Sequence, residues 1–293
     1  MNRGMRKKYV VSLFVALFIT GCAHPEPRIP PEGNPPAERL TLASFNIRIF
    51  SNASRDDAEL ASIADILQKY DLVAIQELRD EEVLKRAVAI LQRRGLGYAY
   101  EISPPVGRGV KERYAFLYRT DRVQSVQPGR IYQERGDEFI REPFYATFRS
   151  SSFDFTLVTI HVLFGSGEAE RRPEIEELAA VYQAVQDEDP AEQDVILLGD
   201  FNFPPEDKGF SRLKAIPGMV FLIAPSVKTT ITDTSLYDNF WFQEPHTREY
   251  VGESGVDRFD ETMFSGDDLA AKRAVSDHRP IWAKFNVGGP DDD

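Results

Sequence analysis

Polar side chains that could bind a metal ion or a phosphate follow one strongly apolar segment of the sequence. Residues 195–198 read as a buried strand, and Gly199, Asp200 and Asn202 come directly after it. Taken alone, the stretch is as easily a simple turn, because Gly, Asp, Asn and Pro are the usual turn residues. The spacing of Asp200 and Asn202 nevertheless turns both side chains to one side of extended backbone, where they could meet a phosphate or a metal ion.

Other strand candidates also carry polar residues at their ends. These residues are Asn46, Glu77, His161, Asp238, Asp277 and His278. Each alone is weak evidence, since a strand-end Asn or Asp is usually a cap and a lone His is usually structural. Together they match what metal-assisted phosphoester cleavage requires, because hard oxygens hold Mg²⁺ and imidazoles move protons near neutral pH.

The elements that must position these residues form one mixed pattern. Helices are predicted at 56–70, 81–93 and 168–186, and strands at 40–47, 72–76, 98–102, 113–118, 123–132, 143–148, 153–161, 195–198, 238–242 and 280–285. The sequence shows no internal repeat and no second linker. We therefore predict a single α/β domain in which helices cover sheets.

The N-terminal segment reads as an export signal. All four charges of residues 1–21 are positive and precede an apolar run at 9–19, which is too short to be a comfortable membrane span. Residues 19–22, Ile-Thr-Gly-Cys, resemble the bacterial lipobox, and this resemblance implies cleavage before Cys22 and lipid attached to it. An ordinary signal peptide or anchor with a chance cysteine is the alternative.

The domain boundaries follow from composition. Residues 22–39 hold the lipidated cysteine and a tether with six prolines, residues 40–287 form the folded domain, and residues 288–293 form an acidic tail. Cys22 is the only cysteine. The exported domain therefore has no internal disulfide and depends on its core.

The charge balance limits the partners. The formal net charge is −12, and removal of the four positive charges of the signal takes it to −16. Such a surface does not attract nucleic acid or anionic lipid by bulk electrostatics. A polyanionic substrate would need cations and a local group of arginines, whereas most of the negative charge serves solubility.

The order of the motifs resembles the endonuclease/exonuclease/phosphatase superfamily. The motifs are LASFNIRIF, VAIQELRD, ERYAFLY, IREPF, TIHVLF, LLGDFN, SLYDNFWF and SDHRP, and the resemblance covers roughly residues 40–286. GDFN and SDH are typical of the whole superfamily, while KERYAFLYRTDRV together with REPF resembles its deoxyribonuclease I branch. The resemblance implies an α/β (α+β) fold, a four-layer α/β/β/α sandwich of two mainly antiparallel sheets face to face with outer helices.

The resemblance also implies a metal site and a phosphate site. Glu77, with Asn46 nearby, would hold a divalent cation, Mg²⁺ or Mn²⁺, and Asp277 could complete a cation site. Asp200 and Asn202 would lie at the scissile phosphate, with Asn202 as a donor to it. The role of Asp200 stays open between a partner of the metal and a partner of the nucleophilic water.

Two histidines would flank the phosphate in the same way. His161 would be oriented by Glu112, and His278 by Asp238. A carboxylate that holds one ring nitrogen fixes the tautomer and raises the basicity of the other nitrogen. One imidazole would activate water and the other would assist the leaving oxygen, with no preference between them.

Further matches concern DNA and calcium. Arg48, Arg79 and Arg141 match arginines at or near the DNA-binding face of the deoxyribonuclease branch, although each could equally form a surface ion pair. Asp137, Phe139 and Glu142 resemble a structural Ca²⁺ site.

Two departures weaken these matches. The loop at 132–137 looks shorter, which leaves the calcium site incomplete. Val110 stands where that branch has a tyrosine that stacks in the minor groove. This second departure puts cleavage of duplex DNA in doubt more than phosphoester hydrolysis.

The leading hypothesis is a metal-dependent phosphodiesterase, a non-specific DNA endonuclease tethered by lipid outside the cytoplasm. One alternative is a phosphodiesterase or phosphatase that acts on lipid or small-molecule phosphoesters, and another is an inactive binding lipoprotein. DNA or another phosphodiester is the expected partner, the membrane is contacted only through the N-terminal lipid, and no obligate protein partner is evident. Ala23 favours the outer membrane if the source is Gram-negative.

Overall fold

The structure is a computed structural model that describes residues 1, 39–165 and 167–290. The predicted signal peptide beyond Met1, Cys22 and residues 23–38 of the tether lie outside the described residues, as do the last three residues of the predicted acidic tail. These assignments stay predictions. The first strand begins at Arg39, the last residue of the predicted tether.

Twelve strands and seven α-helices are described, with one short 3₁₀ helix, η1 (Lys208–Phe210). The strands are β1 (Arg39–Phe50), β2 (Leu72–Leu78), β3 (Tyr98–Ile102), β4 (Arg113–Arg119), β5 (Gln124–Ile131), β6 (Phe144–Ser150), β7 (Phe153–His161), β8 (Val195–Asp200), β9 (Met219–Phe221), β10 (Asp238–Gln243), β11 (Tyr250–Val256) and β12 (Ile281–Asn286). The helices are α1 (Asp57–Leu67), α2 (Glu81–Arg93), α3 (Glu168–Glu176), α4 (Leu178–Glu188), α5 (Ser211–Lys214), α6 (Phe259–Phe264) and α7 (Asp268–Ala274).

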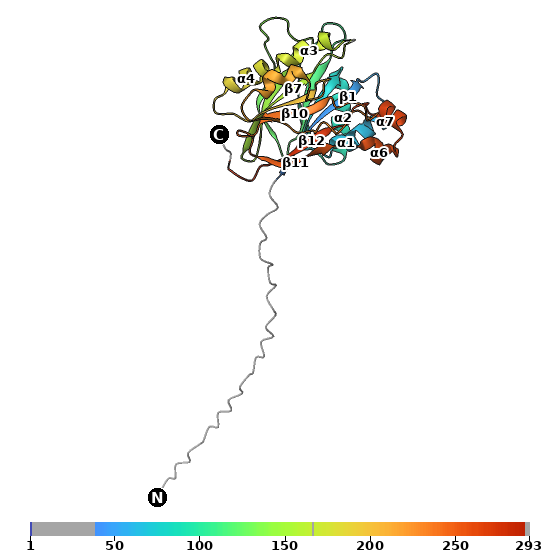
Figure 1. The fold of residues 1–293 in the computed structure, drawn as a ribbon. Coiled ribbons are helices and arrows are strands. Elements are labelled where there is room, and N and C mark those ends of the chain that lie inside the picture. Colours follow the sequence, from blue (N-terminus) through green and yellow to red (C-terminus); the bar gives the residue numbers. More distant parts are fainter. Residues whose placement is uncertain (2–38, 166, 291–293) are drawn as a thin grey trace. The chain divides into compact units, whose positions relative to one another are not determined.

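The strands form two six-stranded sheets. One sheet has the order β11-β12-β1-β2-β4-β3 and the other the order β5-β6-β7-β8-β10-β9 (Figure 1). Each sheet contains one parallel pair, β1 with β2 and β7 with β8, and all its other pairs are antiparallel. The two sheets therefore have the same number of strands and the same pattern of one parallel pair among antiparallel pairs.

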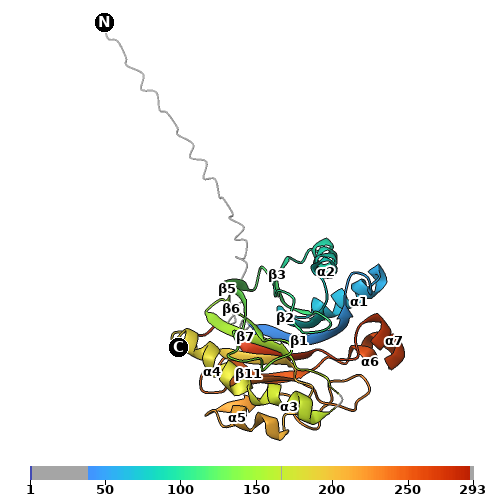
Figure 2. The ribbon, with the colours of Figure 1, turned by 90° about the horizontal axis from the view of Figure 1, so that it is seen from above.

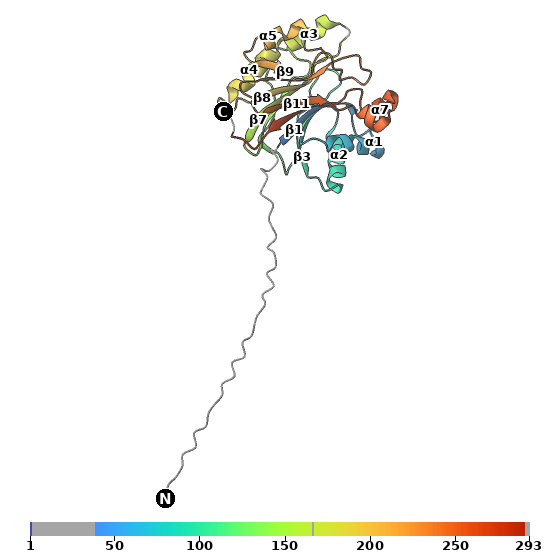
Figure 3. The same ribbon diagram turned by 60° about the horizontal axis from the view of Figure 1, so that its bottom comes forward.

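Three apolar layers hold the domain together. The sheets face each other across a core that includes Leu42, Leu157 and Phe240, while a second core lies under α1, α2, α6 and α7 and a third under α3, α4 and α5. Figures 2 and 3 show the two sets of helices on opposite sides of the paired sheets. This arrangement confirms the predicted four-layer α/β/β/α sandwich.

The central strands are apolar on both faces because both faces are covered. In β8, Val195 and Leu197 pack toward the helices, while Ile196 and Leu198 pack between the sheets. Successive side chains of a strand point to opposite faces, so a strand buried on both sides shows no polar alternation. The prediction of a buried strand at 195–198 is therefore confirmed.

Several elements differ from the prediction. The single helix predicted at 168–186 is two helices, α3 and α4, which meet at Glu177. The backbone nitrogen of Glu177, at the C-terminal end of α3, donates a hydrogen bond to the carbonyl of Pro173, a residue inside the helix whose own nitrogen cannot donate. Two strands, β9 and β11, and three helices, α5, α6 and α7, were not predicted. Strand β11 contains two glycines, and the other four elements are short.

Candidate active site

The sheet topology brings the polar strand ends to one edge of the sandwich. The parallel strands β1, β2, β7 and β8 end there, and their antiparallel neighbours β4, β10 and β12 begin there. Residues that close the first group of strands and open the second group must therefore meet. They include Asn46, Glu77, Glu112, His161, Asp200, Asp238 and His278.

Asp200 is the central residue of this edge and is buried. In the ladder of its sheet it lies opposite His161 on one side and Asp238 on the other. The preceding Gly199 makes this close approach feasible, because a Cβ there would lie 2.1 Å from the carbonyl oxygen of Ile160. Its φ of +147° is also a conformation that other residues rarely adopt.

His161 is held by a buried carboxylate. Its Nδ1 lies 2.8 Å from Oε2 of Glu112, and because the carboxylate only accepts, Nδ1 carries the proton. The backbone nitrogen of His161 donates to the hydroxyl of Tyr114, 3.0 Å away. These contacts leave Nε2 facing Oδ2 of Asp200 at 3.6 Å.

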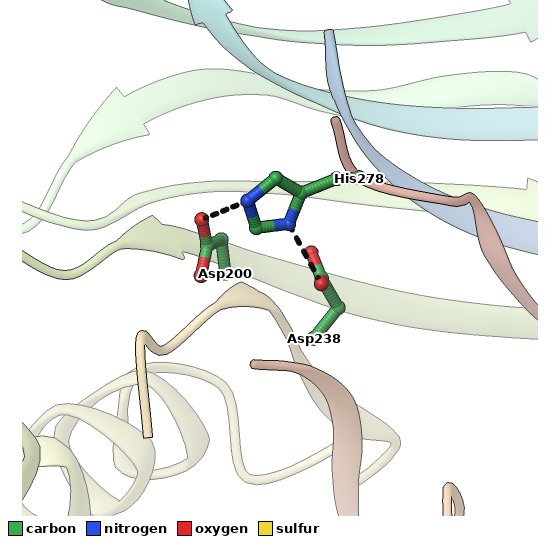
Figure 4. Close-up of side chains that lie close together, drawn as sticks. All are labelled: Asp200, Asp238 and His278. Carbon is green, nitrogen blue, oxygen red and sulfur yellow. Dashed lines mark hydrogen bonds and ion pairs between the residues drawn. The ribbon is translucent and has the colours of Figure 1, made fainter. Parts of the chain in front are cut away.

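His278, which precedes β12 of the other sheet, is also held between two carboxylates. Its Nδ1 lies 2.9 Å from Oδ2 of Asp238, and its Nε2 lies 3.6 Å from Oδ2 of Asp200 (Figure 4). Both imidazoles therefore point their second nitrogen at the same carboxylate oxygen. Two proton-carrying groups and one acidic group thus converge on a single point.

The carboxylates determine the protonation of both rings. Burial by itself would lower the pKa of His278, but the negative charges of Asp238 and Asp200 raise it to about 10. In His161 the same opposition between burial and the carboxylates of Glu112 and Asp200 also raises the pKa. Burial and the nearby charge of Asp200 raise the pKa of Asp238.

Glu112 stays ionised for a related reason. Burial would raise the pKa of this carboxyl group, but the hydrogen bond from His161 and the guanidinium groups of Arg141 and Arg79 hold it below the usual value. Nε of Arg141 lies 3.1 Å from Oε2 of Glu112, and Arg79 approaches its other oxygen at 3.2 Å. Two predicted phosphate-binding arginines are therefore in contact with this carboxylate.

The three predicted phosphate-binding arginines differ in exposure. Arg48 keeps 41% of its side chain exposed, compared with 20% for Arg79 and 14% for Arg141. All three line a cleft of about 430 Å³ above the two imidazoles. Arg48 is the arginine best placed to meet a substrate from solvent.

Glu77 and Asn46 lie together where a metal ion was predicted. Nδ2 of Asn46 donates to Oε1 of Glu77 at 3.3 Å and to Oδ2 of Asp200 at 2.9 Å. Oδ1 of Asn46 is buried and has no hydrogen-bond partner among the described residues. A buried amide oxygen left without a partner, on a side chain whose nitrogen contacts two carboxylates, fits a hard divalent cation, which binds carboxylate and amide oxygens.

A second set of potential ligands overlaps the histidine site. Among the described residues, Asp200, Asp238 and His278 place one ligand atom each within 4.8 Å of one another. Asp238 already holds Nδ1 of His278. Oδ1 of Asp238 has no hydrogen-bond partner among the described residues. A metal ion on Nε2 of His278 would, however, occupy the nitrogen through which this ring could transfer a proton, so we favour Glu77 and Asn46 for the metal.

Asp277 is occupied by cations of the protein itself. Nζ of Lys272 lies 2.9 Å from its Oδ2, and Nε of Arg48 lies 3.6 Å away. Burial would raise the pKa of Asp277, but Lys272 and His278 lower it. In the described part of the chain, Asp277 forms no hydrogen bond or ion pair with Glu77 or Asn46, although it lines the same cleft as Glu77.

Asn202 forms structural hydrogen bonds that the sequence did not predict. Its backbone nitrogen donates to Oδ1 of Asp200 at 2.9 Å, and its side-chain Nδ2 donates to the carbonyl of Val162 at 2.8 Å. Its φ of +52° is left-handed. The side chain that was predicted as a phosphate donor thus ties the loop after β8 to the end of β7.

Sequence reasoning assigned no role to several supporting residues. Oγ of Ser276 donates to the carbonyl of Asn46 and accepts from the backbone nitrogens of Arg48 and His278. Its place beside Asp277 and His278 in the SDH motif was the only signal for it. Lys272 and Tyr114 had none, because their roles depend on contacts between distant segments.

The predicted calcium ligands do not fit a calcium ion. The guanidinium of Arg108 lies 2.5 Å from Oδ1 of Asp137 and donates to the carbonyls of Asp137 and Phe139 at 3.1 and 3.4 Å. Oxygens that would face a calcium ion therefore already bind a cationic side chain. Among the described residues, Glu142, the third predicted ligand, forms no hydrogen bond or ion pair with Arg108, Asp137 or Phe139.

Comparisons with known proteins agree with the site. Residues 43–278 match the endonuclease/exonuclease/phosphatase family. A deoxyribonuclease of Thioalkalivibrio sp. (strain K90mix) is 33% identical over 261 residues, covering 84% of this chain and 71% of the relative. Deoxyribonuclease-1 of Oryctolagus cuniculus is 33% identical over 265 residues, covering 84% of this chain and 92% of the relative.

Solved structures share the fold at lower identity. The human Nocturnin catalytic domain with bound sulfate anion superposes with a TM-score of 0.60 at 15% identity, covering 84% of this chain and 94% of the other. An endonuclease/exonuclease/phosphatase family protein from Bacteroides thetaiotaomicron superposes with a TM-score of 0.58 at 18% identity, covering 85% of this chain and 97% of the other. At such identities the likeness concerns the fold alone.

Fold, site and relatives together define the class of this protein, which is a hydrolase that acts on phosphodiester bonds. The chain belongs to the endonuclease/exonuclease/phosphatase family and is related to the deoxyribonuclease I-like nucleases within it. Within the residues that the structure describes, no helix has the length and apolar character needed to span a membrane.

Proposed function

We propose that the protein is a divalent-metal-dependent, non-specific DNA endonuclease. The observation that carries the proposal is the convergence of Nε2 of His161 and Nε2 of His278 on Oδ2 of Asp200, each at 3.6 Å. The deoxyribonuclease relatives support DNA as the substrate.

The residues of the site divide the work of hydrolysis. One imidazole takes a proton from the attacking water as its oxygen bonds to phosphorus, and the other gives a proton to the leaving oxygen as its bond to phosphorus breaks. Glu112 and Asp238 hold the rings in position for these transfers. Arg48 neutralises charge on the phosphate.

Glu77 and Asn46 would hold Mg²⁺ or Mn²⁺. When bound, such an ion supplies Lewis-acid stabilisation of the charge on the phosphate oxygens. The unpartnered Oδ1 of Asn46 supports this assignment. Asp277 is less suited to the role, since Lys272 and Arg48 already neutralise it.

The test is the nicking of supercoiled plasmid by the purified protein with Mg²⁺. We expect nicking in the wild type, and loss of nicking both with a chelator and in His278→Ala. Intact plasmid together with cleavage of a chromogenic phosphodiester or of sphingomyelin would assign the protein to lipid or small-molecule substrates instead.

We also propose that the protein is exported and held at a membrane by lipid on Cys22. The support is the signal-like sequence of residues 1–21 and the Cys22 that follows it. Incorporation of labelled palmitate by wild type but not by Cys22→Ala would agree with this proposal. Equal incorporation in both would contradict it.

A further inference from the structure

An exposed aromatic side chain stands on the rim of the active-site cleft and is not used by the proposed mechanism. Phe164 lines the cleft and is 65% exposed. Leaving so much of a phenyl ring in water is unfavourable, so an aromatic ring at the rim of a polar cleft indicates a contact for a ligand. The question is whether its exposure is built into the fold.

The backbone that leads to Phe164 is fixed by hydrogen bonds. The carbonyl of Val162 accepts from the side chain of Asn202 at 2.8 Å. The nitrogen of Leu163 donates at 3.0 Å to Glu174, a buried carboxylate of α3 that also accepts from Ile140. The two residues before Phe164 are therefore anchored, and a loose loop does not explain its exposure.

The ring of Phe164 is also held in place by its neighbours. The guanidinium of Arg171 lies 5.4 Å from its centroid and 4.6 Å from that of Phe203. Nε and Nη1 of Arg171 are buried and have no hydrogen-bond partner among the described residues. Arg171 is thus fixed mainly by aromatic faces, and it supports Phe164 from one side.

Aromatic contacts connect Phe164 to the catalytic edge. Its centroid lies 6.4 Å from that of Tyr237, and the ring of Tyr237 lies 6.4 Å from that of His278. Tyr237 lines the same cleft. The ring of Tyr237 therefore lies between the exposed ring of Phe164 and the imidazole of His278, which would act at the scissile phosphate.

We propose that Phe164, with Tyr237 beside it, is a stacking platform for a nucleobase next to the scissile phosphate. This inference rests on the proposed function and deepens it. A base in a duplex has both faces covered by its neighbours, so only an unpaired base can use the platform. The site therefore favours single-stranded or locally unpaired DNA over continuous duplex.

The platform is tested with matched substrates. One is a labelled single strand of thymidines, and the other is a strand of the same length that consists of abasic analogues. Hydrolysis of both is measured with Mg²⁺ for wild type, Phe164→Ala, Phe164→Trp and Val126→Ala. Val126 is an exposed apolar residue of β5 that does not line the cleft, so its variant is the matched control.

We expect Phe164→Ala to lower kcat/KM on the thymidine strand by roughly 5- to 150-fold, mainly through KM, as the loss of one base–aromatic stack predicts. On the abasic strand it should stay within about twofold of wild type. Phe164→Trp should retain activity and Val126→Ala should match wild type. Equal losses on both strands, or no loss on either, would overturn the platform.

Two further measurements complete the test. Wild type should cleave the single strand faster than the same sequence in a duplex, and Phe164→Ala should reduce this difference; faster cleavage of the duplex would overturn the proposal. If wild type hydrolyses no phosphodiester, the proposed function fails. Fluorescence anisotropy of the two strands with wild type and Phe164→Ala then still decides whether Phe164 binds bases.

Discussion

The residue that organises the site is a carboxylate that faces two imidazoles. Asp200 accepts hydrogen bonds from Asn46 and from the backbone of Asn202, and it faces Nε2 of both histidines. No arginine or lysine pairs with it among the described residues. Its charge is therefore balanced only by imidazoles and by whatever binds in the cleft, which suits a catalytic role better than a structural one.

We expect Asp200→Asn to abolish turnover while the protein stays folded. The variant keeps the shape of the side chain but removes the charge that both imidazoles face, so kcat should fall by about 100-fold or more. The loss of the negative charge weakens the hydrogen bonds that residue 200 accepts, but it also removes the repulsion between this charge and that of Asp238. Because these two effects oppose each other, Tm should shift by less than about 4 °C. Nicking assays and thermal unfolding measure the two quantities, and a near-normal rate would contradict the assignment.

The His278–Asp238 pair makes a pH prediction for the metal-free protein. Because the carboxylates raise the pKa of His278 to about 10, above the ordinary value of about 6.5, the pair stabilises the fold fully below about pH 6.5. This stabilisation is lost as the pH rises toward 10. NMR titration of the ring should give a midpoint well above 6.5 in wild type.

The variant Asp238→Asn separates the two causes of this shift. It removes the partner of Nδ1 but leaves Asp200 in place, so the midpoint should fall toward the ordinary value without a change of fold. An unchanged midpoint for His278 would show that Asp238 does not hold it.

At the scale of elements, the contact between β7 and β8 determines where the catalytic groups lie. The two strands are parallel, and Gly199 lies opposite Ile160, one residue before His161 and Asp200 reach the edge together. The absent side chain at Gly199 lets the backbones approach at that point. A change there would move both catalytic residues.

We expect Gly199→Ala to destabilise the fold by about 3 kcal/mol and to remove activity, because the new Cβ would lie 2.1 Å from a backbone oxygen. Gly95→Ala is the matched control. Gly95 also has a positive φ, +81°, but no heavy atom lies within 4 Å of its Cβ position, so about 1 kcal/mol is expected. Urea unfolding measures both, and equal effects would contradict the argument.

The contact between Arg108, in the loop before β4, and Asp137, in the loop after β5, gives a prediction about calcium. Because Arg108 occupies the oxygens of Asp137 and Phe139, added Ca²⁺ should not raise Tm, and a calcium chelator should not lower it. Arg108→Ala should lower Tm by a few degrees, and added Ca²⁺ should then recover part of the loss. A calcium-dependent Tm in wild type would contradict this interpretation.

At the scale of the whole molecule, the negative net charge of the chain repels an anionic substrate. The chain carries a formal net charge of −12, so attraction of a polyanion depends on a few cations that line the cleft, Arg48 and Lys272 among them. Long-range steering should be weak and the contacts few. Affinity for DNA should therefore depend only moderately on salt.

This charge distribution predicts the salt dependence of DNA binding. With a few phosphate contacts, the logarithm of the binding constant of a single strand should fall with the logarithm of salt by about 0.7 per contact, and Arg48→Ala should reduce that slope by about 0.7. Arg212→Ala, on α5 outside the cleft, should leave it unchanged. A slope of the same size in all three proteins would contradict the role of Arg48.

Much of the fold and the membership of the site could be predicted from the sequence. Apolar runs such as 195–198 and the motifs around Asn46 and His161 carry local signals, because strand burial and catalytic chemistry restrict which residues can follow one another. The four-layer sandwich was predicted through resemblance. Elements with weak local patterns, β11, α6 and α7, were not, because packing against the rest of the domain stabilises them.

The sequence by itself determined which residue types are available for chemistry and that they lie at strand ends. Only the tertiary structure decided their partners, because those depend on which strands are neighbours. It joined Asp200 to both imidazoles, turned Asn202 into a brace, bound Asp277 to Lys272 and Arg48, and placed Arg108 among the predicted calcium ligands. Contacts between segments that are far apart in the chain produce no regular residue spacing, so they cannot be recognised in a sequence. The contact between the rings of Phe164 and Tyr237 is one of these.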